Sequence, residues 1–146
     1  MDHQASRGIG RFKSGTLDVS VVECFQNVVN VLSISGDNQL GGCDFDELIA
    51  RHVCQKLSFS FLELEEKDRS RLLFQCEQLK WKLTDDEEAR MEIFLFENKH
   101  SVSMDRRELV NISTPIFKKI DQIVKGALVD ASMEIAELSQ VILVGG

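Results

Sequence analysis

Hydrophobic and polar residues alternate along the first part of the chain with the two-residue period of a β-strand. In "TLDVSVVECF", Leu17, Val19 and Val21 fall on one side of the strand and polar residues fall between them. The apolar segment "VVNVLSIS" follows directly after Gln26 and Asn27. The pattern therefore predicts a β-hairpin with a short turn at these two residues.

Further along the chain, the spacing of the hydrophobic residues changes to the period of helices and later returns to that of a strand. Helices are predicted for "DFDELIARHVCQKL", with Asp44 or Asp46 as its N-cap, and for "EEKDRSRLLFQCEQLKWKLT". The alternation in "ARMEIFLFENKHSVSM" predicts a second hairpin. A long helical stretch begins at Asp105, and Pro115 is expected to break it, with Thr114 capping the following segment.

The two ends of the chain give weaker patterns. Residues 1–13, "MDHQASRGIGRFK", predict a loose leader without a secretory signal. "SMEIAELSQ" predicts a short helical turn, and "VILVGG" predicts a fully buried strand that runs parallel to its neighbours. Because paired glycines after a strand usually begin a loop, the chain is expected to be cut within a motif.

Composition and charge narrow the class of protein. The 146 residues fit one domain or part of one, and 43% of them are hydrophobic. The net charge of -7 argues against binding to nucleic acid or to an anionic membrane surface. The four cysteines have no CxxC spacing, which favours free thiols over a zinc or redox site and favours a reducing, cytoplasmic location.

The glycine-rich segment "SGDNQLGGCDFDEL" has two interpretations. Gly41 and Gly42 stand just before a predicted helix, where glycines allow close approach to a ligand and helix N-termini attract anions. A phosphate-binding loop is one interpretation. A plain turn from strand to helix is the other, and it is commoner for glycines alone.

One face of the second predicted helix carries polar and aromatic residues. Glu77, Lys80, Trp81 and Thr84 recur at i, i+3, i+4 and i+7 and therefore share a face. Hydrogen-bonding groups beside a flat indole could hold a purine nucleoside. The alternative is an ordinary surface with a half-buried tryptophan.

Four motifs in this order resemble the ATPase domain of the heat shock protein 70 (Hsp70) chaperone family. They are "SGTLDVSVV", "GDNQLGGCDFDELIARHV", "CEQLKWKLT" and "VILVGG". The resemblance covers residues 14–146 and implies an α/β fold, part of the second lobe of an actin-like ATPase. It also implies a mixed sheet with a hairpin, and a separate helical and hairpin subdomain at about residues 43–130.

The resemblance implies a set of nucleotide-binding residues. Those on the phosphate side are Ser14, Gly15 and Thr16 of the phosphate-binding turn, Asp18 near the metal, and the cleft-lining Gly41 and Gly42. Those on the nucleoside side are Glu77, Lys80, Trp81, which replaces a stacking arginine, and Thr84 near the sugar, with Gly145 and Gly146 opening a second loop. No catalytic residue and no metal ligand is assigned.

Departures from the family pattern bear on activity. The family's phosphate turn is Asp-Leu-Gly-Gly-Gly-Thr, whereas this chain has "RFKSGT", with Arg11 at the position of an acid and Lys13 at that of a glycine. The family's first lobe and its peptide-binding domain have no counterpart in this sequence.

The implied function is the ATP-binding lobe of an Hsp70-like chaperone, with ATP or ADP and Mg²⁺ as ligands. This lobe is not expected to hydrolyse ATP alone. One alternative is a non-enzymatic module that binds nucleotide exchange factors or co-chaperones. A degenerate product without activity is the other alternative.

Overall fold

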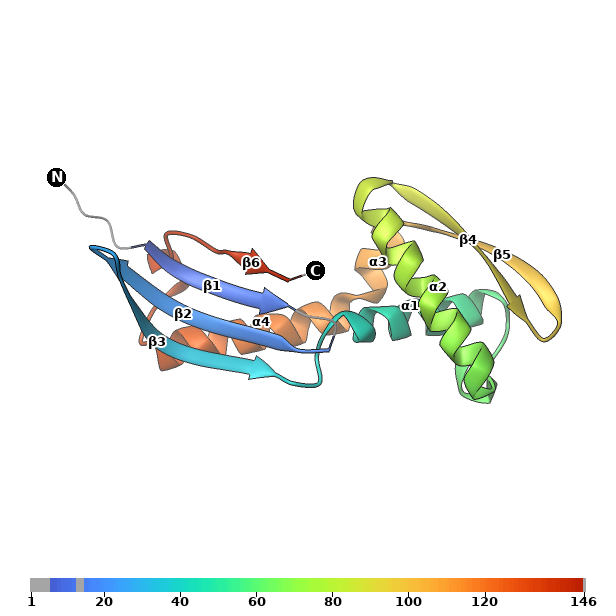
Figure 1. Cartoon of the computed structure of the whole chain (residues 1–146), viewed down its shortest axis with the longest axis horizontal. Coiled ribbons are helices and arrows are strands. Elements are labelled where there is room, and N and C mark those ends of the chain that lie inside the picture. Colours follow the sequence, from blue (N-terminus) through green and yellow to red (C-terminus); the bar gives the residue numbers. More distant parts are fainter. Residues whose placement is uncertain (1–5, 13–14, 146) are drawn as a thin grey trace. The chain divides into compact units, whose positions relative to one another are not determined.

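The computed structural model describes residues 6–12 and 15–145, with side chains from residue 15 onward. Its mixed α/β chain divides into two compact units (Figure 1). The first contains the residues up to Gly42 and those from Ile116 onward, and the second is Cys43–Pro115. The second unit thus ends at Pro115, whereas the family resemblance implied an outer subdomain that extends to about residue 130.

The sheet of the first unit has four strands in the order β3-β2-β1-β6. These are β1 (Ser6–Phe12), β2 (Leu17–Phe25), β3 (Val28–Asp37) and β6 (Leu143–Val144). β2 is antiparallel to both β1 and β3, and β6 is parallel to β1. The predicted hairpin is confirmed, and Gln26 and Asn27 form its turn with φ of 46° and 66°.

The structure corrects the predictions for both ends of the chain. Residues 6–12 form β1 rather than a loose leader, because backbone pairing with β2 and β6 places them in the sheet without any apolar alternation. Residues 1–5 and 13 lie outside the described residues. The strand predicted at "VILVGG" is present as β6 and is parallel to its neighbour β1, as predicted, but it has only two residues and is not buried, since Leu143 is 85% exposed.

One face of this sheet packs against α4 (Thr114–Asp130), which runs alongside the strands (Figure 1). The Ser33 hydroxyl donates a 2.7 Å hydrogen bond to the carbonyl of Ala127. Val21 pairs with Ser33 and Val19 with Ser35, so these valines share that face, and both are buried. After α4, the chain makes a 3₁₀ turn at Ile135–Glu137, in agreement with the predicted helical turn.

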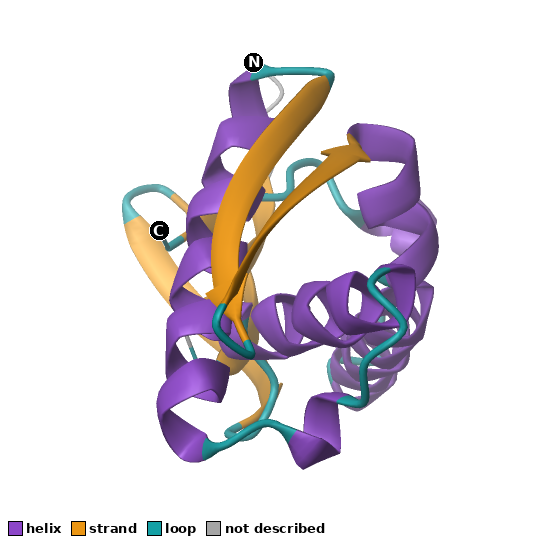
Figure 2. Cartoon of the chain, turned by 90° about the vertical axis from the view of Figure 1, so that its right-hand side faces the viewer, coloured by secondary structure: helices purple, strands orange, loops and turns teal. Residues whose placement is uncertain are grey.

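The second unit combines three helices with a hairpin (Figure 2). The elements are α1 (Gly42–Lys56), a 3₁₀ turn at Phe61–Glu63, α2 (Glu66–Asp85), β4 (Glu88–Leu95), β5 (Asn98–Asp105) and α3 (Arg106–Ile112). Along β4, buried and exposed residues alternate strictly, as predicted. The fully buried core is built from α1, α2, β4 and β5, and α3 packs against it with partly buried residues. The core includes Ile49, Val53, Leu72, Cys76, Leu79, Leu83, Leu95 and Met104.

Capping contacts fix the ends of these helices. Asp105 caps α3 by accepting a 2.7 Å hydrogen bond from the Glu108 N–H. The Arg106 guanidinium donates to the carbonyls of Leu83, at 2.9 Å, and Thr84, at 3.1 Å, and so satisfies the C-terminal end of α2. The predicted break near Pro115 is confirmed, since α3 ends at Ile112 and α4 begins at Thr114.

Candidate functional site

The structure divides the predicted nucleotide-binding residues between the two units. The first unit contains Gly15, Thr16, Asp18, Gly41, Gly42 and Gly145, and the second contains Glu77, Lys80, Trp81 and Thr84. Ser14 and Gly146 lie outside the described residues.

In the first group, two glycines bring separate segments into close contact. A Cβ on Gly41 would lie 2.6 Å from the backbone N, Cα and C atoms of Gly15, so no other residue fits there without a backbone shift. Gly15 itself has open space where a Cβ would project. The loop that contains Gly41 and Gly42, which we call the glycine loop, is thus held against the start of β2. One side of the predicted phosphate turn, at Gly15, is open.

The glycine loop also has the features of a structural turn. The Gln39 N–H donates a 2.8 Å hydrogen bond to the Asp37 carboxylate, and Leu40 is fully buried as an anchor. Asp18, on β2, is exposed. These contacts account for the fold of the loop, and phosphate binding there remains a prediction.

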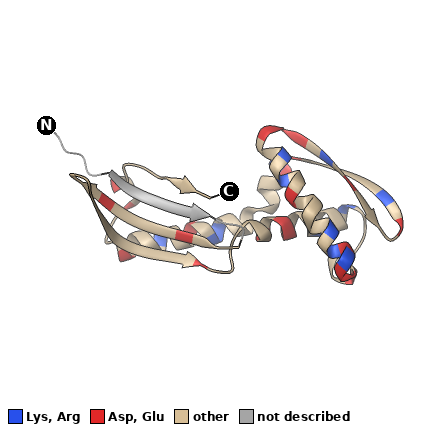
Figure 3. Cartoon of the chain, in the orientation of Figure 1, with Lys and Arg blue, Asp and Glu red and all other residues tan. Residues whose placement is uncertain are grey.

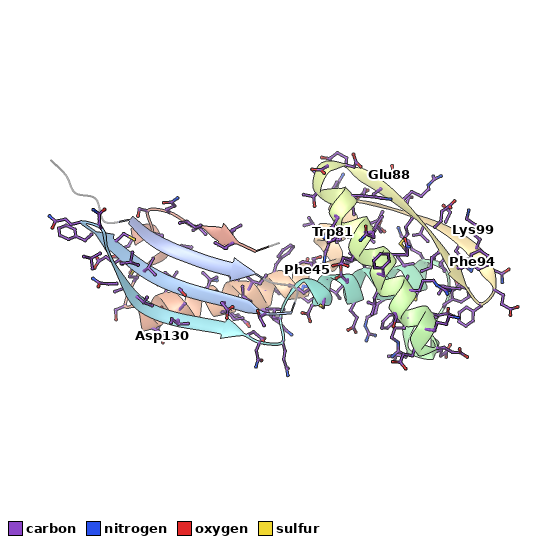
Figure 4. All side chains as sticks on the ribbon, viewed as in Figure 1. Phe45, Trp81, Glu88, Phe94, Lys99 and Asp130 are labelled. Carbon is purple, nitrogen blue, oxygen red and sulfur yellow. The ribbon has the colours of Figure 1, made fainter. Side chains whose placement is uncertain are left out.

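The second group lies on α2, and the side chains of Glu77, Trp81 and Thr84 are directed away from the core. Trp81 is 56% exposed (Figure 4), Thr84 is exposed and Glu77 is half-buried, whereas the core residues of α2 are buried. Trp81 is therefore not a core residue of α2. Phe74 is also exposed and precedes Trp81 by two helical turns, so the spacing i, i+7 could have identified it.

Lys80 has an internal partner. Its ammonium lies 2.6 Å from the carboxylate of Asp46 on α1, and the two side chains are only 21% and 12% exposed. Desolvation raises the pKa of Asp46, with a smaller contribution from the negative charge of Glu77, while Lys80 counteracts the increase.

The proposed cap Asp46 is therefore a buried charge within α1. Neither it nor Asp44 precedes the helix, because α1 begins at Gly42. Asp46 falls on the same face as Ile49, Ala50 and Val53, which are all buried. A buried carboxylate requires a charged or hydrogen-bonding partner. The helical spacing of Asp46 from these apolar residues could therefore have predicted such a partner from the sequence.

A second charged cluster connects α1 with α3. Glu108 Oε1 lies 2.6 Å from both His52 Nε2 and Lys56 Nζ, and Lys56 also donates to the Ser103 carbonyl at 2.9 Å. Partial burial acts to raise the pKa of Glu108, but the hydrogen bonds from Lys56 and His52 outweigh it and lower that pKa. His52 thus serves as a structural partner of Glu108.

The second unit also carries a groove that sequence reasoning missed, which we call the aromatic groove. It has a volume of about 480 Å³ and is lined by Glu65, Asp68, Arg71, Phe94, Phe96 and Glu97. Phe94 is 52% exposed on β4 (Figure 4). Phe96 and Glu97 form the hairpin turn with φ of 49° and 62°, where Asn or Gly is usual, and the Phe96 ring lies 4.9 Å from that of Phe59.

Neither a metal-binding cluster nor a membrane-spanning helix is found among the described residues. Within residues 15–145, no three His, Cys, Asp or Glu side chains are grouped so that they could hold a metal ion. None of the helices in this part of the chain is both long and apolar enough to span a membrane.

Comparison with known proteins gives consistent matches. The family model described as "Hsp70 protein" matches residues 10–146. The chain is 31% identical over 132 residues to "Chaperone protein HscA" of Buchnera aphidicola subsp. Baizongia pistaciae, covering 90% of this chain and 25% of that protein. It is 34% identical over 132 residues to a "Chaperone protein HscA homolog" of Vibrio cholerae serotype O1, covering 90% and 20%.

A third relative, the "Chaperone protein HscA homolog" of Laribacter hongkongensis, is 35% identical over 133 residues, covering 90% of this chain and 21% of that protein. The chain thus spans between a fifth and a quarter of the length of these relatives. The family match extends over both compact units and includes the glycine loop, the polar face of α2 and β6. The chain belongs to the Hsp70 family.

Proposed function

We propose that this chain is an ATP-binding part of an Hsp70-type chaperone, from the second lobe of the actin-like ATPase domain. The observation that carries the proposal is the exposed ring of Trp81, which shares one face of α2 with Glu77 and Thr84. Four free cysteines support a reducing compartment, which we take to be the cytoplasm.

The residues on α2 fit an adenosine group in their chemistry. Trp81 offers a flat surface for stacking, Glu77 offers a carboxylate that accepts hydrogen bonds, and Thr84 offers a hydroxyl. Lys80 is engaged with Asp46, so its role in the proposal is to hold α2 against α1. ATP with Mg²⁺ would supply the phosphoanhydride bond that chaperones of this family hydrolyse.

On the phosphate side, the proposal assigns Gly15 and Thr16 to the turn that receives the phosphates. The open space at Gly15 supports this assignment, because a bulky neighbour would block an anion. Asp18 is exposed, as a residue that acts through metal-bound water would need to be. No catalytic step is assigned to these residues.

We expect the chain alone to bind ATP weakly and not to turn it over. Donors that remain in water act in a high dielectric, where each contributes little to transition-state stabilisation. Arg11 also replaces an acid in the phosphate turn, and its positive charge would repel Mg²⁺. A Kd of about 1 mM, equivalent to about 4 kcal/mol of binding free energy, is the expected order of magnitude.

Trp81 is the only tryptophan in the chain, so its fluorescence reports directly on stacking. Titration with ATP and Mg²⁺ should give weak but saturable quenching, and a phosphate-release assay should show no turnover. In calorimetry, Trp81→Ala should abolish the binding heat, whereas Phe94→Ala, an exposed aromatic control, should preserve it. Equal binding by both variants would contradict the assignment of Trp81, and steady turnover would contradict the expected inactivity.

A second candidate function rests on the aromatic groove. We infer that the second unit docks a co-chaperone, such as a nucleotide exchange factor, through Phe94 and Phe96. The groove combines two exposed phenylalanines with three carboxylates, and its one cation, Arg71, lies 3.4 Å from the Asp68 carboxylate. Such a surface fits an apolar side chain flanked by basic residues.

This second candidate is tested with a purified nucleotide exchange factor for Hsp70 chaperones immobilised on a biosensor. Phe94→Ala should weaken binding by roughly tenfold or more, as expected for an aromatic anchor. Trp81→Ala serves here as the control and should bind like the original chain. If the original chain does not bind, or if both variants lose affinity equally, the groove is not the docking site.

A further inference from the structure

The hairpin turn that lines the aromatic groove is built from residues that are unusual for its backbone. Phe96 and Glu97 have positive φ of 49° and 62°. The turn between β2 and β3 has nearly the same φ at Gln26 and Asn27, 46° and 66°, and asparagine tolerates that conformation. Strained positions of this kind concentrate at binding sites. The turn therefore places Phe96 and Glu97 in the groove although other residues would form it more favourably.

Two phenylalanine rings of the groove are accessible to a ligand. Phe94 and Phe96 are 52% and 47% exposed. The Phe96 ring is packed against the Phe59 ring, with their centroids 4.9 Å apart, so its orientation is held by the fold. The exposed face of such a ring attracts a cation, because its π-electrons make that face negative.

The groove also carries negative charge that its own contacts leave uncompensated. Acidic residues occur both in the first turn of α2 and at the turn between β4 and β5 (Figure 3). Within residues 15–145, the carboxylates of Glu65 and Glu97 have no ion-pair partner, and Glu65 accepts no capping hydrogen bond although it is the N-cap of α2. Asp68 has Arg71 at 3.4 Å, and the ammonium of Lys99 lies 2.7 Å from another carboxylate of β4.

We propose that the aromatic groove receives an arginine side chain from an extended segment of the partner that docks there. This proposal rests on the second candidate function and names the basic side chain that the partner inserts. A guanidinium is planar, so its face stacks on the Phe94 ring while its N–H groups donate to the carboxylates of Glu97 and Glu65. A lysine ammonium is a strongly hydrated point charge that offers no flat face for stacking.

The second unit already contains the same contact within its own fold. The guanidinium carbons of Arg51 and Arg69 lie 5.0 and 5.4 Å from the centroid of the Phe61 ring. The volume of the groove, about 480 Å³, is in the range of pockets that hold small ligands, so an arginine and part of the adjacent apolar residue fit together. Charge and shape thus favour the same occupant.

A peptide titration of the full, ¹⁵N-labelled chain, followed by NMR, tests this proposal. The probe is acetyl-Gly-Leu-Arg-Leu-Gly-amide, and the matched peptide has citrulline, which keeps the shape of arginine but has no charge. The arginine peptide should give saturable shifts of the amide signals of residues 65–71 and 94–97. The citrulline peptide should bind roughly tenfold more weakly, because it loses both the ring contact and the ion pairs.

Variants of the chain identify the residues that recognise the arginine. Phe94→Leu, which keeps an apolar side chain, and Glu97→Gln should each weaken binding of the arginine peptide by roughly threefold or more. Glu88→Gln is the matched control, because Glu88 is an exposed acid at the other end of β4 and should leave binding unchanged (Figure 4). Glu97→Asn should weaken binding but raise the thermal midpoint, because asparagine suits the positive φ of this turn.

Three outcomes would each overturn the proposal. They are equal binding of the arginine and citrulline peptides, an absence of saturable shifts at the groove, and equal binding by Glu97→Gln and Glu88→Gln. Failure of the second candidate function is a different result, which the biosensor assay with the exchange factor reports. A partner that inserts only an apolar side chain would lose affinity for Phe94→Ala but not for Glu97→Gln.

Discussion

The ion pair between Lys80 and Asp46 allows a sharp test of how the second unit is stabilised. Lys80→Met keeps the length and the apolar stem of the side chain but removes the ammonium. The carboxylate of Asp46 would then remain on the buried face of α1 without its positive partner, which lies 2.6 Å away in the original chain. The substitution should therefore destabilise the second unit.

The size of the effect follows from the burial of the pair. Exposed ion pairs contribute about 0–1 kcal/mol, whereas breaking a fully buried pair costs about 3–5 kcal/mol. With the two side chains 21% and 12% exposed, this pair lies between these limits. We expect the free energy of unfolding to fall by about 2 kcal/mol, which corresponds to a decrease of about 1–2 M in the urea midpoint.

The pH dependence of stability shows whether the unpaired charge of Asp46 causes the destabilisation. Burial already raises the pKa of Asp46, and loss of Lys80 should raise it further, since Lys80 acts to lower it. A carboxyl group with a raised pKa in the folded state binds its proton more tightly there than in the unfolded state. The loss of unfolding free energy caused by Lys80→Met should therefore become smaller as the pH falls from neutrality through that pKa.

Urea unfolding followed by Trp81 fluorescence measures this directly, because Trp81 neighbours Lys80 on α2. Asp46→Asn provides the control background, in which Lys80→Met should have little further effect. Three results would refute the reasoning. The urea midpoint of Lys80→Met could be unchanged, or its loss of stability could be the same at neutral and acid pH. Lys80→Met could also destabilise the Asp46→Asn chain as much as it destabilises the original chain.

Three further predictions concern the second unit. Glu108→Gln should lower the free energy of unfolding by about 1 kcal/mol at neutral pH, as measured in thermal melts. Because the pKa of Glu108 is lowered in the folded state, its contribution to stability is complete above the ordinary glutamate pKa and is lost as the pH falls through the lowered value. The variant and the original chain should therefore have the same stability in acid. Leu72→Ala should cost about 3 kcal/mol in urea unfolding, since Leu72 is fully buried, and a loss below 1 kcal/mol, on the order of an exposed-site change, would contradict the described packing. In alkylation followed by mass spectrometry, exposed Cys43 should react first, while Cys54 and Cys76, whose pKa values burial raises, should react only on unfolding.

Local patterns in the sequence predicted the elements that depend on local physics. The alternation around Met91 and Ile93 gave the buried face of β4, and the helical spacing around Trp81 gave its exposed face on α2. Pro115 marked the break between α3 and α4 because proline lacks the N–H that a helix interior requires. Each of these signals lies within a few residues of the feature it predicts.

The features that were missed depend on partners distant in the sequence. β1 has no apolar alternation, and it becomes a strand only through pairing with β2 and β6. Asp46 looked like a helix cap because its lysine partner stands on another helix. The aromatic groove was missed for the same reason, since α2 and β4 each contribute only part of its lining.

The division into two units has a consequence for synthesis of the chain. The second unit is one continuous segment, so all of its contacts are available once Pro115 has emerged from the ribosome. The first unit is discontinuous, and β2 and β3 are made long before α4, which covers their buried face, and before β6, which pairs with β1. During this interval the nascent hairpin has both of its faces uncovered, so the first unit is the part of the chain most dependent on protection during translation.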